Sequence, residues 1–288
     1  MPDKYTAVWV SHSSMGDFLK CPRLYYLHNV YKDPVTRQKM SIVTPHMSLG
    51  IAVHEVLEGL GDFPAHERMT RDLHATFEEA WQSVSGKKGG FISKEQEMEF
   101  KNRGKQMIDN VIKNPRFLTN KRIKLPREQM NPNFYLSEDD NIILNGLVDW
   151  IEYLPDDTLH LIDFKTGKHE EKEQSLQLPI YLLLCNALQK RKVSRASYWY
   201  LESDKMVEKE LPDAITAETS VIEIARKVKE ARVLGIDKGG FDCPQGKDGC
   251  THCLPYEEIL KSKRNEPSSA EFVGTGGFGQ DMYIVHKA

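Results

Sequence analysis

Apolar residues recur at two different spacings along the chain, and the change in spacing separates a helical first half from a mixed second half. Apolar positions three or four residues apart predict helices that start near Ser14 and span 47–60, 73–81 and 94–113. From about Phe134 onward, short apolar runs bounded by turn residues predict strands at 142–153, 159–164 and 197–201. Two further helices are expected at 176–188 and 217–234. This order predicts the α/β class, with a core interrupted by a helical insertion at about 61–125.

The composition is that of a globular chain. Its 288 residues suffice for a sizeable core, and 40% hydrophobic and 28% charged residues argue against wholesale disorder. No apolar run is long enough to span a bilayer, and the first residues lack a secretory signal, so we expect a cytoplasmic protein without a membrane partner. We expect one domain over 1–265 and a flexible tail over 266–288. The tail's GTGGFG run has no preceding strand, which excludes a phosphate-binding loop.

The net charge of −3 conceals a basic segment. Between Lys101 and Arg127 there are nine basic residues and one acid, Asp109, so this segment carries +8 and the remainder carries −11. Such a segment can attract a polyanion whatever the total charge is. A solvated helix face and loop is the alternative interpretation.

Two acidic residues and a lysine form the sharpest local pattern. Alternation along the strand at 159–164 places Asp163 and Lys165 on one face. The turn residues 155–157 predict a hairpin with the preceding strand, and hairpin pairing could bring Asp149 near Asp163. Two crowded carboxylates repel each other, and a divalent cation relieves that repulsion. The combination suits phosphodiester hydrolysis, although a surface salt bridge would produce the same Asp–Lys pair.

The five cysteines have the spacing of a metal site rather than of a disulfide framework. Cys243-x6-Cys250-x2-Cys253 lies in a turn-rich loop and lacks a fourth ligand, for which Cys21 is the obvious candidate. Thiolates select Zn²⁺ or iron–sulfur clusters. Ligands from both ends of the chain would tie the N- and C-terminal segments together. Cys185 is expected to be a buried core thiol.

Four short segments, taken in order, resemble the PD-(D/E)XK nuclease superfamily and, within it, the RecB-like nucleases. They are Gly50…His54 (GIAVH), Gly146…Asp149 (GLVD), Asp163-Phe164-Lys165 (DFK) and Gln177…Tyr181 (QLPIY). The resemblance implies a restriction-endonuclease-like core, in which helices flank a central mixed β-sheet. It also implies that the cysteines ligate a metal cluster joining the two ends of the chain.

The resemblance implies a role for each residue of these segments. Mg²⁺ or Mn²⁺ would be bound by His54, Asp149, Asp163 and the backbone carbonyl of Phe164. Lys165 would position or activate the attacking water. Gln177 and Tyr181 would support the site or contact DNA. Without the resemblance, His54 among valines and leucines would be a packed core residue.

One early and three late cysteines are similar to the iron–sulfur nucleases of this superfamily, such as AddB-type subunits and CRISPR-associated RecB-like exonucleases. The resemblance implies a [4Fe–4S] cluster on Cys21, Cys243, Cys250 and Cys253. Here the longer gap comes first among the last three cysteines, unlike the usual pattern, and Zn²⁺ is the alternative ion.

The sequence therefore predicts a metal-dependent DNA nuclease. The resemblance favours an exonuclease on single-stranded DNA or duplex ends, in DNA repair, recombination or CRISPR adaptation, with protein partners in such a complex. A non-catalytic DNA-binding or assembly module with the same fold is the alternative, and a zinc-stabilised protein without a nucleic-acid role is a third hypothesis.

Overall fold

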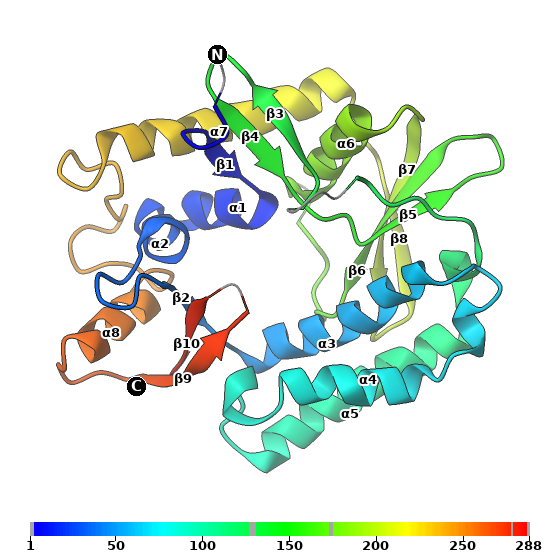
Figure 1. The fold of residues 1–288 in the computed structure, drawn as a ribbon, viewed down its shortest axis with the longest axis horizontal. Coiled ribbons are helices and arrows are strands. Elements are labelled where there is room, and N and C mark those ends of the chain that lie inside the picture. The colour runs from blue at the N-terminus through cyan, green and yellow to red at the C-terminus, as the bar shows by residue number, and fades with distance from the viewer. Residues whose placement is uncertain (1–2, 127–130, 173–174, 278, 287–288) are drawn as a thin grey trace.

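A computed structural model describes residues 3–126, 131–172, 175–277 and 279–286, and its strands form three sheets within these ranges (Figure 1). The largest sheet has the order β5-β6-β7-β8, with strands Trp150–Tyr153, Leu159–Lys165, Val193–Tyr200 and Lys205–Lys209. A second sheet has the order β1-β4-β3, with strands Val8–Val10, Ile142–Asn145 and Asn133–Ser137. The third has the order β2-β10-β9, with strands Lys39–Ile42, Gln280–Val285 and Ala270–Gly276. The fold is thus the mixed α/β class that the sequence predicts.

The largest sheet is mixed and buried on both faces. Strand β6 pairs antiparallel with β5 and parallel with β7, and helix α6 (Gln177–Leu188) forms the crossover between β6 and β7. One face packs against α6 and α7 (Ala214–Leu234), and the other packs against the helices of the insertion. Strand β6 is therefore buried at every position except Lys165, as expected for a central strand covered on both sides. Ile162 and Phe164 face the insertion, whereas Leu161 and Asp163 face α6.

Three helices cover the insertion side of this sheet. They are α3 (Pro45–Gly59), α4 (Leu73–Ser83) and α5 (Lys94–Lys113), and their positions match the helices expected from apolar spacing. The side chains of Thr44, Asp72 and Ser93 accept hydrogen bonds from backbone amides in the first turns, which explains where each helix starts.

Helix α1 (His12–Lys20) begins earlier than the sequence analysis expects. Its N-cap is Ser11, and Ser11 and Ser14 form a reciprocal capping box. A short helix, α2 (Pro22–Tyr25), follows directly after Cys21.

The strand expected at 142–153 is wrong in its extent. The structure has two strands there, β4 and β5, in different sheets. Residues 146–148 between them are irregular, and a Cβ on Gly146 would lie 2.9 Å from Leu184 Cδ1. A side chain at position 146 would have to displace the end of Leu184, so glycine lets the chain pass close to α6 between the two strands.

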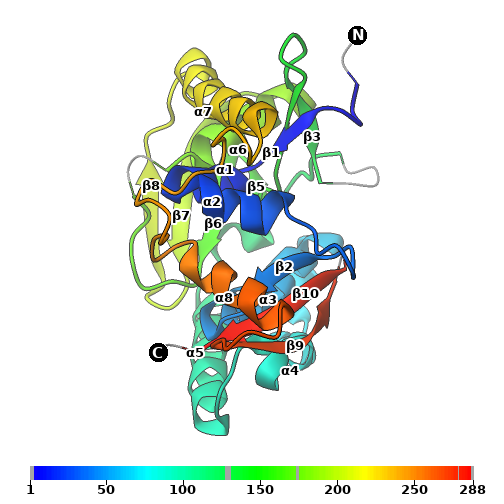
Figure 2. The ribbon, with the colours of Figure 1, turned by 90° about the vertical axis from the view of Figure 1, so that its left-hand side faces the viewer.

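The segment expected to be a flexible tail instead contributes strands β9 and β10. Strand β10 pairs parallel with β2, which lies near the other end of the chain, and buries Asp281, Tyr283 and Ile284. Because its partner is so distant in sequence, local pattern alone does not reveal this pairing. Figure 2 shows this sheet beside α8 (Leu254–Lys263).

A buried ion group holds this sheet to α8. Lys263 Nζ lies 2.8 Å from Asp281 Oδ2 and 3.1 Å from Asp33 Oδ2, and it stacks over the ring of Tyr283. Backbone N–H donors, Thr36 first, together with Lys263 lower the pKa of Asp33. This contribution to stability is complete above the ordinary carboxyl pKa of about 4 and is lost as the pH falls below it.

None of the helices in the described part of the chain combines the length and apolarity needed to cross a membrane.

We expect Lys263→Met to lower the free energy of unfolding by about 3–5 kcal/mol, because it leaves two buried carboxylates without their cation. Exposed Lys227 on α7 provides the control, and Lys227→Met should change stability by less than about 0.5 kcal/mol. Denaturant titration at neutral pH measures both values. Equal effects of the two substitutions would contradict the buried-charge interpretation.

Candidate functional site

A hairpin brings two acidic residues to the same end of the largest sheet. Strand β5 pairs with β6 so that Trp150 faces Ile162, and one more step in this register places Asp149 opposite Asp163. Asp149 Oδ2 accepts a hydrogen bond of 2.8 Å from the backbone N–H of Phe164. Both carboxylates are buried, with 7% and 2% of Asp149 and Asp163 exposed. The structure thus brings together the two acids that the sequence analysis singles out.

Helix α3 adds a histidine and a glutamate next to Asp149. His54 Nε2 lies 3.0 Å from the Phe164 carbonyl oxygen, and His54 Nδ1 lies 3.3 Å from Glu58 Oε1 and 3.5 Å from Asp149 Oδ2. Ligand atoms of His54, Glu58 and Asp149 all lie within 4.8 Å of one another. The sequence analysis did not identify Glu58, although its position four residues after His54 puts it on the same helix face.

Asp163 lies opposite Asp149 in the strand register but is not one of these three residues, and it is held from α6. The Tyr181 hydroxyl donates a hydrogen bond of 3.0 Å to Asp163 Oδ1, and the Gln177 amide donates to the same oxygen. Asp163 Oδ2 is buried and makes no hydrogen bond, although Lys165 Nζ lies 2.9 Å away as an ion-pair partner. Gln177 and Tyr181 therefore orient one carboxylate oxygen, and the other oxygen faces Lys165.

The electrostatics favour a cation between these acids. Burial, and then the charge of Asp163, raise the pKa of Asp149 well above its ordinary value. Burial lowers the pKa of His54, but Asp149 and the hydrogen bond to Glu58 outweigh burial and raise it to about 9. Protonated His54 is thus the counter-ion in the metal-free site.

The donor atoms fit a hard divalent cation. Carboxylate oxygens, a backbone carbonyl and an imidazole nitrogen are available, and one buried oxygen of Asp163 lacks a hydrogen bond. Mg²⁺ or Mn²⁺ is compatible with this set. A cation held here would displace the proton of His54, since a metal-binding imidazole must be neutral.

Lys165 is an ammonium held between two carboxylates. Its Nζ lies 2.9 Å from Asp163 Oδ2 and 3.3 Å from Glu171 Oε2, and it donates a hydrogen bond to Gln177 Oε1. Burial lowers the pKa of Lys165, but the two carboxylates raise it above its ordinary value. The amine therefore stays charged at neutral pH, so it can orient a water or stabilise an anion, but it is poorly suited to accept a proton. The sequence analysis missed Glu171, whose loop position carries no pattern.

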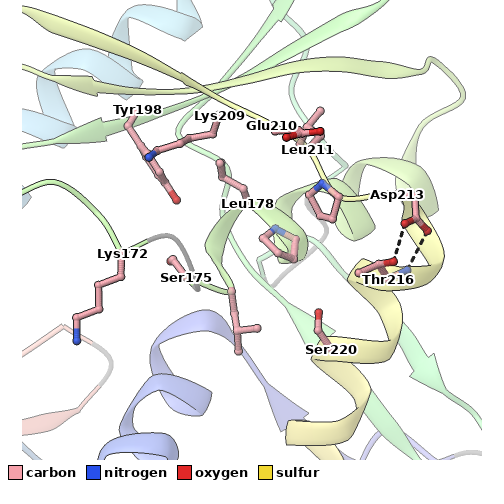
Figure 3. Close-up of a pocket in the computed structure, with 13 residues that line it drawn as sticks. Lys172, Ser175, Leu178, Tyr198, Lys209, Glu210, Leu211, Asp213, Thr216 and Ser220 are labelled. Atoms are coloured by element: carbon pink, nitrogen blue, oxygen red, sulfur yellow. Dashed lines mark hydrogen bonds between the residues drawn. The ribbon is translucent and has the colours of Figure 1, made fainter.

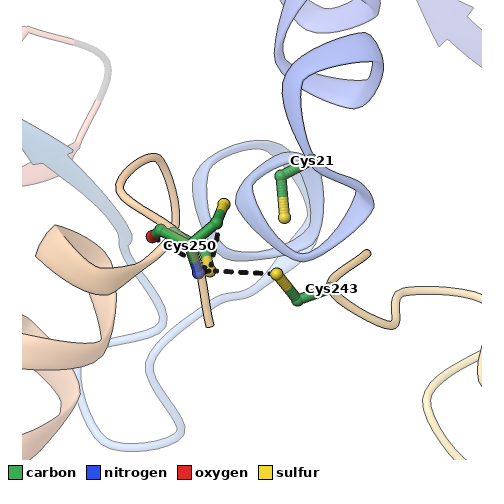
Figure 4. Close-up of side chains that lie close together, drawn as sticks. Cys21, Cys243 and Cys250 are labelled. Carbon is green, nitrogen blue, oxygen red and sulfur yellow. Dashed lines mark hydrogen bonds between the residues drawn. The ribbon is translucent and has the colours of Figure 1, made fainter. Parts of the chain in front are cut away.

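The four cysteines also meet. Cys21 lies between α1 and α2, and the other three lie in the loop between α7 and α8 (Figure 4). All four are buried, and their Sγ atoms lie within 4.8 Å of one another. Burial raises the pKa of Cys250, but backbone N–H donors of Cys253 and His252 outweigh it and lower that pKa to about 7. This environment suits a thiolate ligand.

The distances between the sulfur atoms can be compared with those that Zn²⁺ and a [4Fe–4S] cluster require. Cys253 Sγ lies 3.8 Å from Cys250 Sγ and 3.9 Å from Cys243 Sγ. A tetrahedral Zn²⁺ with Zn–S bonds of about 2.3 Å separates its sulfurs by about 3.8 Å. In a [4Fe–4S] cluster each thiolate binds a different iron, so these sulfurs would have to move apart.

The basic segment 101–127 is partly neutralised by ion pairs with acids of other segments, which is closer to the solvated helix face and loop than to a free basic strip. Most of its cations pair with acids, namely Glu78 for Lys101 and Lys105, Glu202 for Arg103, Asp204 for Arg116 and Asp62 for Lys124. Arg127 lies outside the described residues. Phe117 of the same segment is only 4% exposed and packs against Trp150, Phe164 and Trp199, so its ring is not free to stack on a DNA base.

Two cavities adjoin the site. One of about 800 Å³ lies between α6, the end of β8 and the start of α7 (Figure 3). It reaches the site through Tyr198, whose ring centroid lies 4.9 Å from Lys165 Nζ, but it contains none of the acidic ligand atoms. The other, of about 510 Å³, is lined by both Glu58 and Asp149 and therefore opens on the metal-binding group itself.

Comparison with known proteins agrees with this geometry. The family model of the PD-(D/E)XK nuclease superfamily matches residues 9–259, which include all of the site residues described above. No curated protein shows a significant match to the chain.

We expect Cys250→Ala to release the metal held by the four cysteines and to lower the free energy of unfolding by at least about 2 kcal/mol. That loss corresponds to a drop in Tm of roughly 4–8 °C. The matched control is Cys185→Ala. Cys185 is also a buried thiol, but it packs in a different hydrophobic cluster from the four cysteines. It should keep the full metal content, even though the smaller side chain also lowers stability. Elemental analysis and thermal melting check both variants, and unchanged metal content in Cys250→Ala would contradict the assignment.

Proposed function

The chain belongs to the PD-(D/E)XK nuclease superfamily, and from this premise we propose that it is a metal-dependent nuclease that hydrolyses phosphodiester bonds in DNA. The observation that carries the proposal is the convergence of Asp149, Asp163 and Lys165 at one end of β5 and β6. Nucleases of this superfamily use divalent ions, and the donor atoms here suit such an ion.

Each side chain of the site has a distinct part in the proposal. His54, Asp149, Asp163 and the Phe164 carbonyl would hold Mg²⁺ or Mn²⁺, and Glu58 would bind it directly or orient His54. When bound, the ion supplies Lewis acidity toward a phosphate oxygen and lowers the pKa of a bound water. Lys165, kept charged by its two carboxylate neighbours, orients the attacking water and offsets negative charge on the phosphate.

The α6 residues keep this arrangement rigid. Gln177 bridges Lys165 and Asp163 through the two ends of its amide, and Tyr181 fixes the same Asp163 oxygen from one helical turn further on. These contacts set the distance between the acid and the ammonium before substrate arrives. We therefore assign them a positioning role.

We further propose a RecB-like exonuclease that acts on single-stranded DNA or duplex ends, on the resemblance of the four motif segments. Residues 1–265 would form one nuclease domain, to which β9 and β10 are added. Pathways that process DNA ends, including repair, recombination and CRISPR adaptation, use such an activity. Purified protein with Mn²⁺ should degrade end-labelled linear strands and leave circular DNA intact, and cleavage of circles would instead indicate an endonuclease.

The four cysteines would hold either a [4Fe–4S] cluster, which the resemblance to iron–sulfur nucleases implies, or Zn²⁺, which their sulfur spacing matches. In both cases the group ties the first helices to the segment before α8. Iron and sulfide content with visible absorption, measured on anaerobically purified protein, distinguishes the two.

We expect Asp149→Asn and Asp163→Asn each to reduce cleavage by about 10³-fold or more, equivalent to roughly 4 kcal/mol, because each removes a metal-binding charge. DNA binding and folding should persist, since both side chains are nearly isosteric with the originals. Asp157→Asn is the matched control, because Asp157 lies in the turn of the same hairpin with φ of 63°, a conformation that Asn tolerates. If no form of the protein, wild type included, cuts any DNA, a non-catalytic DNA-binding module becomes the better interpretation.

For Lys165→Met we expect kcat to fall by about 10²–10³-fold with little change in KM, because the ammonium acts on developing charge rather than on ground-state binding. Lys168→Met, at an exposed lysine of the following loop, should leave both parameters unchanged. Steady-state cleavage of a labelled oligonucleotide gives both values. A rise in KM alone would show that Lys165 only contributes to DNA binding.

A further inference from the structure

A cationic side chain without a carboxylate partner lies in the cavity that opens on the metal-binding group. This cavity of about 510 Å³ is formed by the end of α3, the segment 122–125 and the residues around Asp149. Acids that include Glu58 and Asp149 line one part of it, and Arg122 lines another.

Arg122 differs from the two other described arginines of the basic segment 101–127, Arg103 and Arg116. Arg103 and Arg116 pair with Glu202 and Asp204 at 2.9 and 3.0 Å. By contrast, no carboxylate oxygen of the described residues lies within 4.0 Å of the Arg122 guanidinium. Its buried Nε has no hydrogen bond, and its Nη1 makes only a long contact of 3.4 Å to the Glu58 backbone carbonyl. Burial, followed by the charge of Arg68, lowers the pKa of Arg122 to about 10, so it remains a cation at neutral pH.

The position of this guanidinium is fixed by its surroundings. It stacks on buried Trp150, with its central carbon 4.1 Å from the ring centroid. On its other side is Gly61, where an added Cβ would lie 1.7 Å from Arg122 Nη1. The chain thus reserves a space that only a glycine leaves open. The guanidinium is held in place before any ligand arrives.

Structural roles account for only part of this arrangement. A cation near the C-terminus of α3 is favourable, and so is its contact with the indole ring. However, a guanidinium has five N–H donors, and these contacts leave most of them unused on a partly desolvated charge. The neighbouring Lys124 also lines the cavity, but it pairs with Asp62.

We propose that Arg122 forms a phosphate subsite, which binds a backbone phosphate of the same DNA strand whose scissile phosphate lies at the metal-binding group. The inference rests on the proposed nuclease function and deepens it. Two N–H groups of a planar guanidinium match two phosphate oxygens. Because Glu58, whose backbone Arg122 contacts, also belongs to the metal-binding group, a phosphate held by Arg122 sets which linkage along the strand meets the metal ion.

The decisive experiment removes the charge of Arg122 and, separately, the charge of single backbone phosphates, and it measures DNA binding in each case. The Asp163→Asn protein, which should bind without cutting, is titrated with oligodeoxynucleotides that each carry one neutral methylphosphonate, moved along the strand. With Arg122 present, neutralising one linkage close to the cleavage position should weaken binding about tenfold. Arg122→Gln should weaken binding of the unmodified strand by a similar factor, abolish the sensitivity at that linkage only, and reduce the slope of log K against log salt by about one. Arg116→Gln, which alters a paired arginine outside the cavity, should leave the scan unchanged.

A second variant tests the same subsite without removing the arginine, in case Arg122→Gln does not fold. Gly61→Ala keeps the charge of Arg122 but displaces its guanidinium, so it should also remove the sensitivity at that linkage. If Arg122→Gln or Gly61→Ala folds and gives the same methylphosphonate scan as the parent, the subsite is refuted and Arg122 has a packing role. If the wild type cuts no DNA while the position-specific effect is present, the nuclease proposal fails and the phosphate subsite stands. Cleavage without any sensitive linkage refutes the subsite alone.

Discussion

The repulsion between two buried carboxylates is the constraint around which this site is built. Asp149 and Asp163 face each other across a hairpin, both are almost fully buried, and the charge of one raises the pKa of the other. Such a pair is unfavourable unless positive charge is supplied next to it. The surrounding elements supply that charge from two directions, with His54 from α3 and Lys165 from the end of β6. These two cations offset the carboxylate charge, and a divalent ion at the same place would offset it further.

The site depends on the sheet being covered on both faces. The α6 side contributes Gln177 and Tyr181, which hold Asp163. The insertion side buries Phe164 in the aromatic cluster with Phe117 and Trp199, and this anchors the backbone carbonyl that His54 contacts. The aromatic packing therefore acts on the chemistry through the backbone of β6 and through the Phe164 ring, whose centroid lies 5.9 Å from that of the His54 imidazole.

Two further features join the N-terminal and C-terminal parts of the chain outside the acidic site. The four cysteines join the segment before α2 to the loop before α8, and strand β10 pairs with β2. The sheet of β2, β10 and β9 buries its own ion group around Lys263. Both features link residues more than two hundred positions apart in the chain. The sheet stabilises the fold by burying apolar side chains of its own small cluster, and a metal on the cysteines would stabilise it because the unfolded chain does not hold the four ligands together.

The sequence by itself determined what depends on near neighbours. Helices such as α5 followed from apolar spacing, and strand alternation placed Asp163 and Lys165 on one face, because helix and strand periods are local properties. The cysteine spacing likewise indicated a shared site. Only the tertiary structure decided which distant groups meet: Glu58 with Asp149, Glu171 with Lys165, β2 with β10, and several basic residues of the insertion with their acids. It also decided that Arg122 lacks such an acid. A charge count along the chain cannot show whether a cation is paired, because pairing depends on distances that only packing sets.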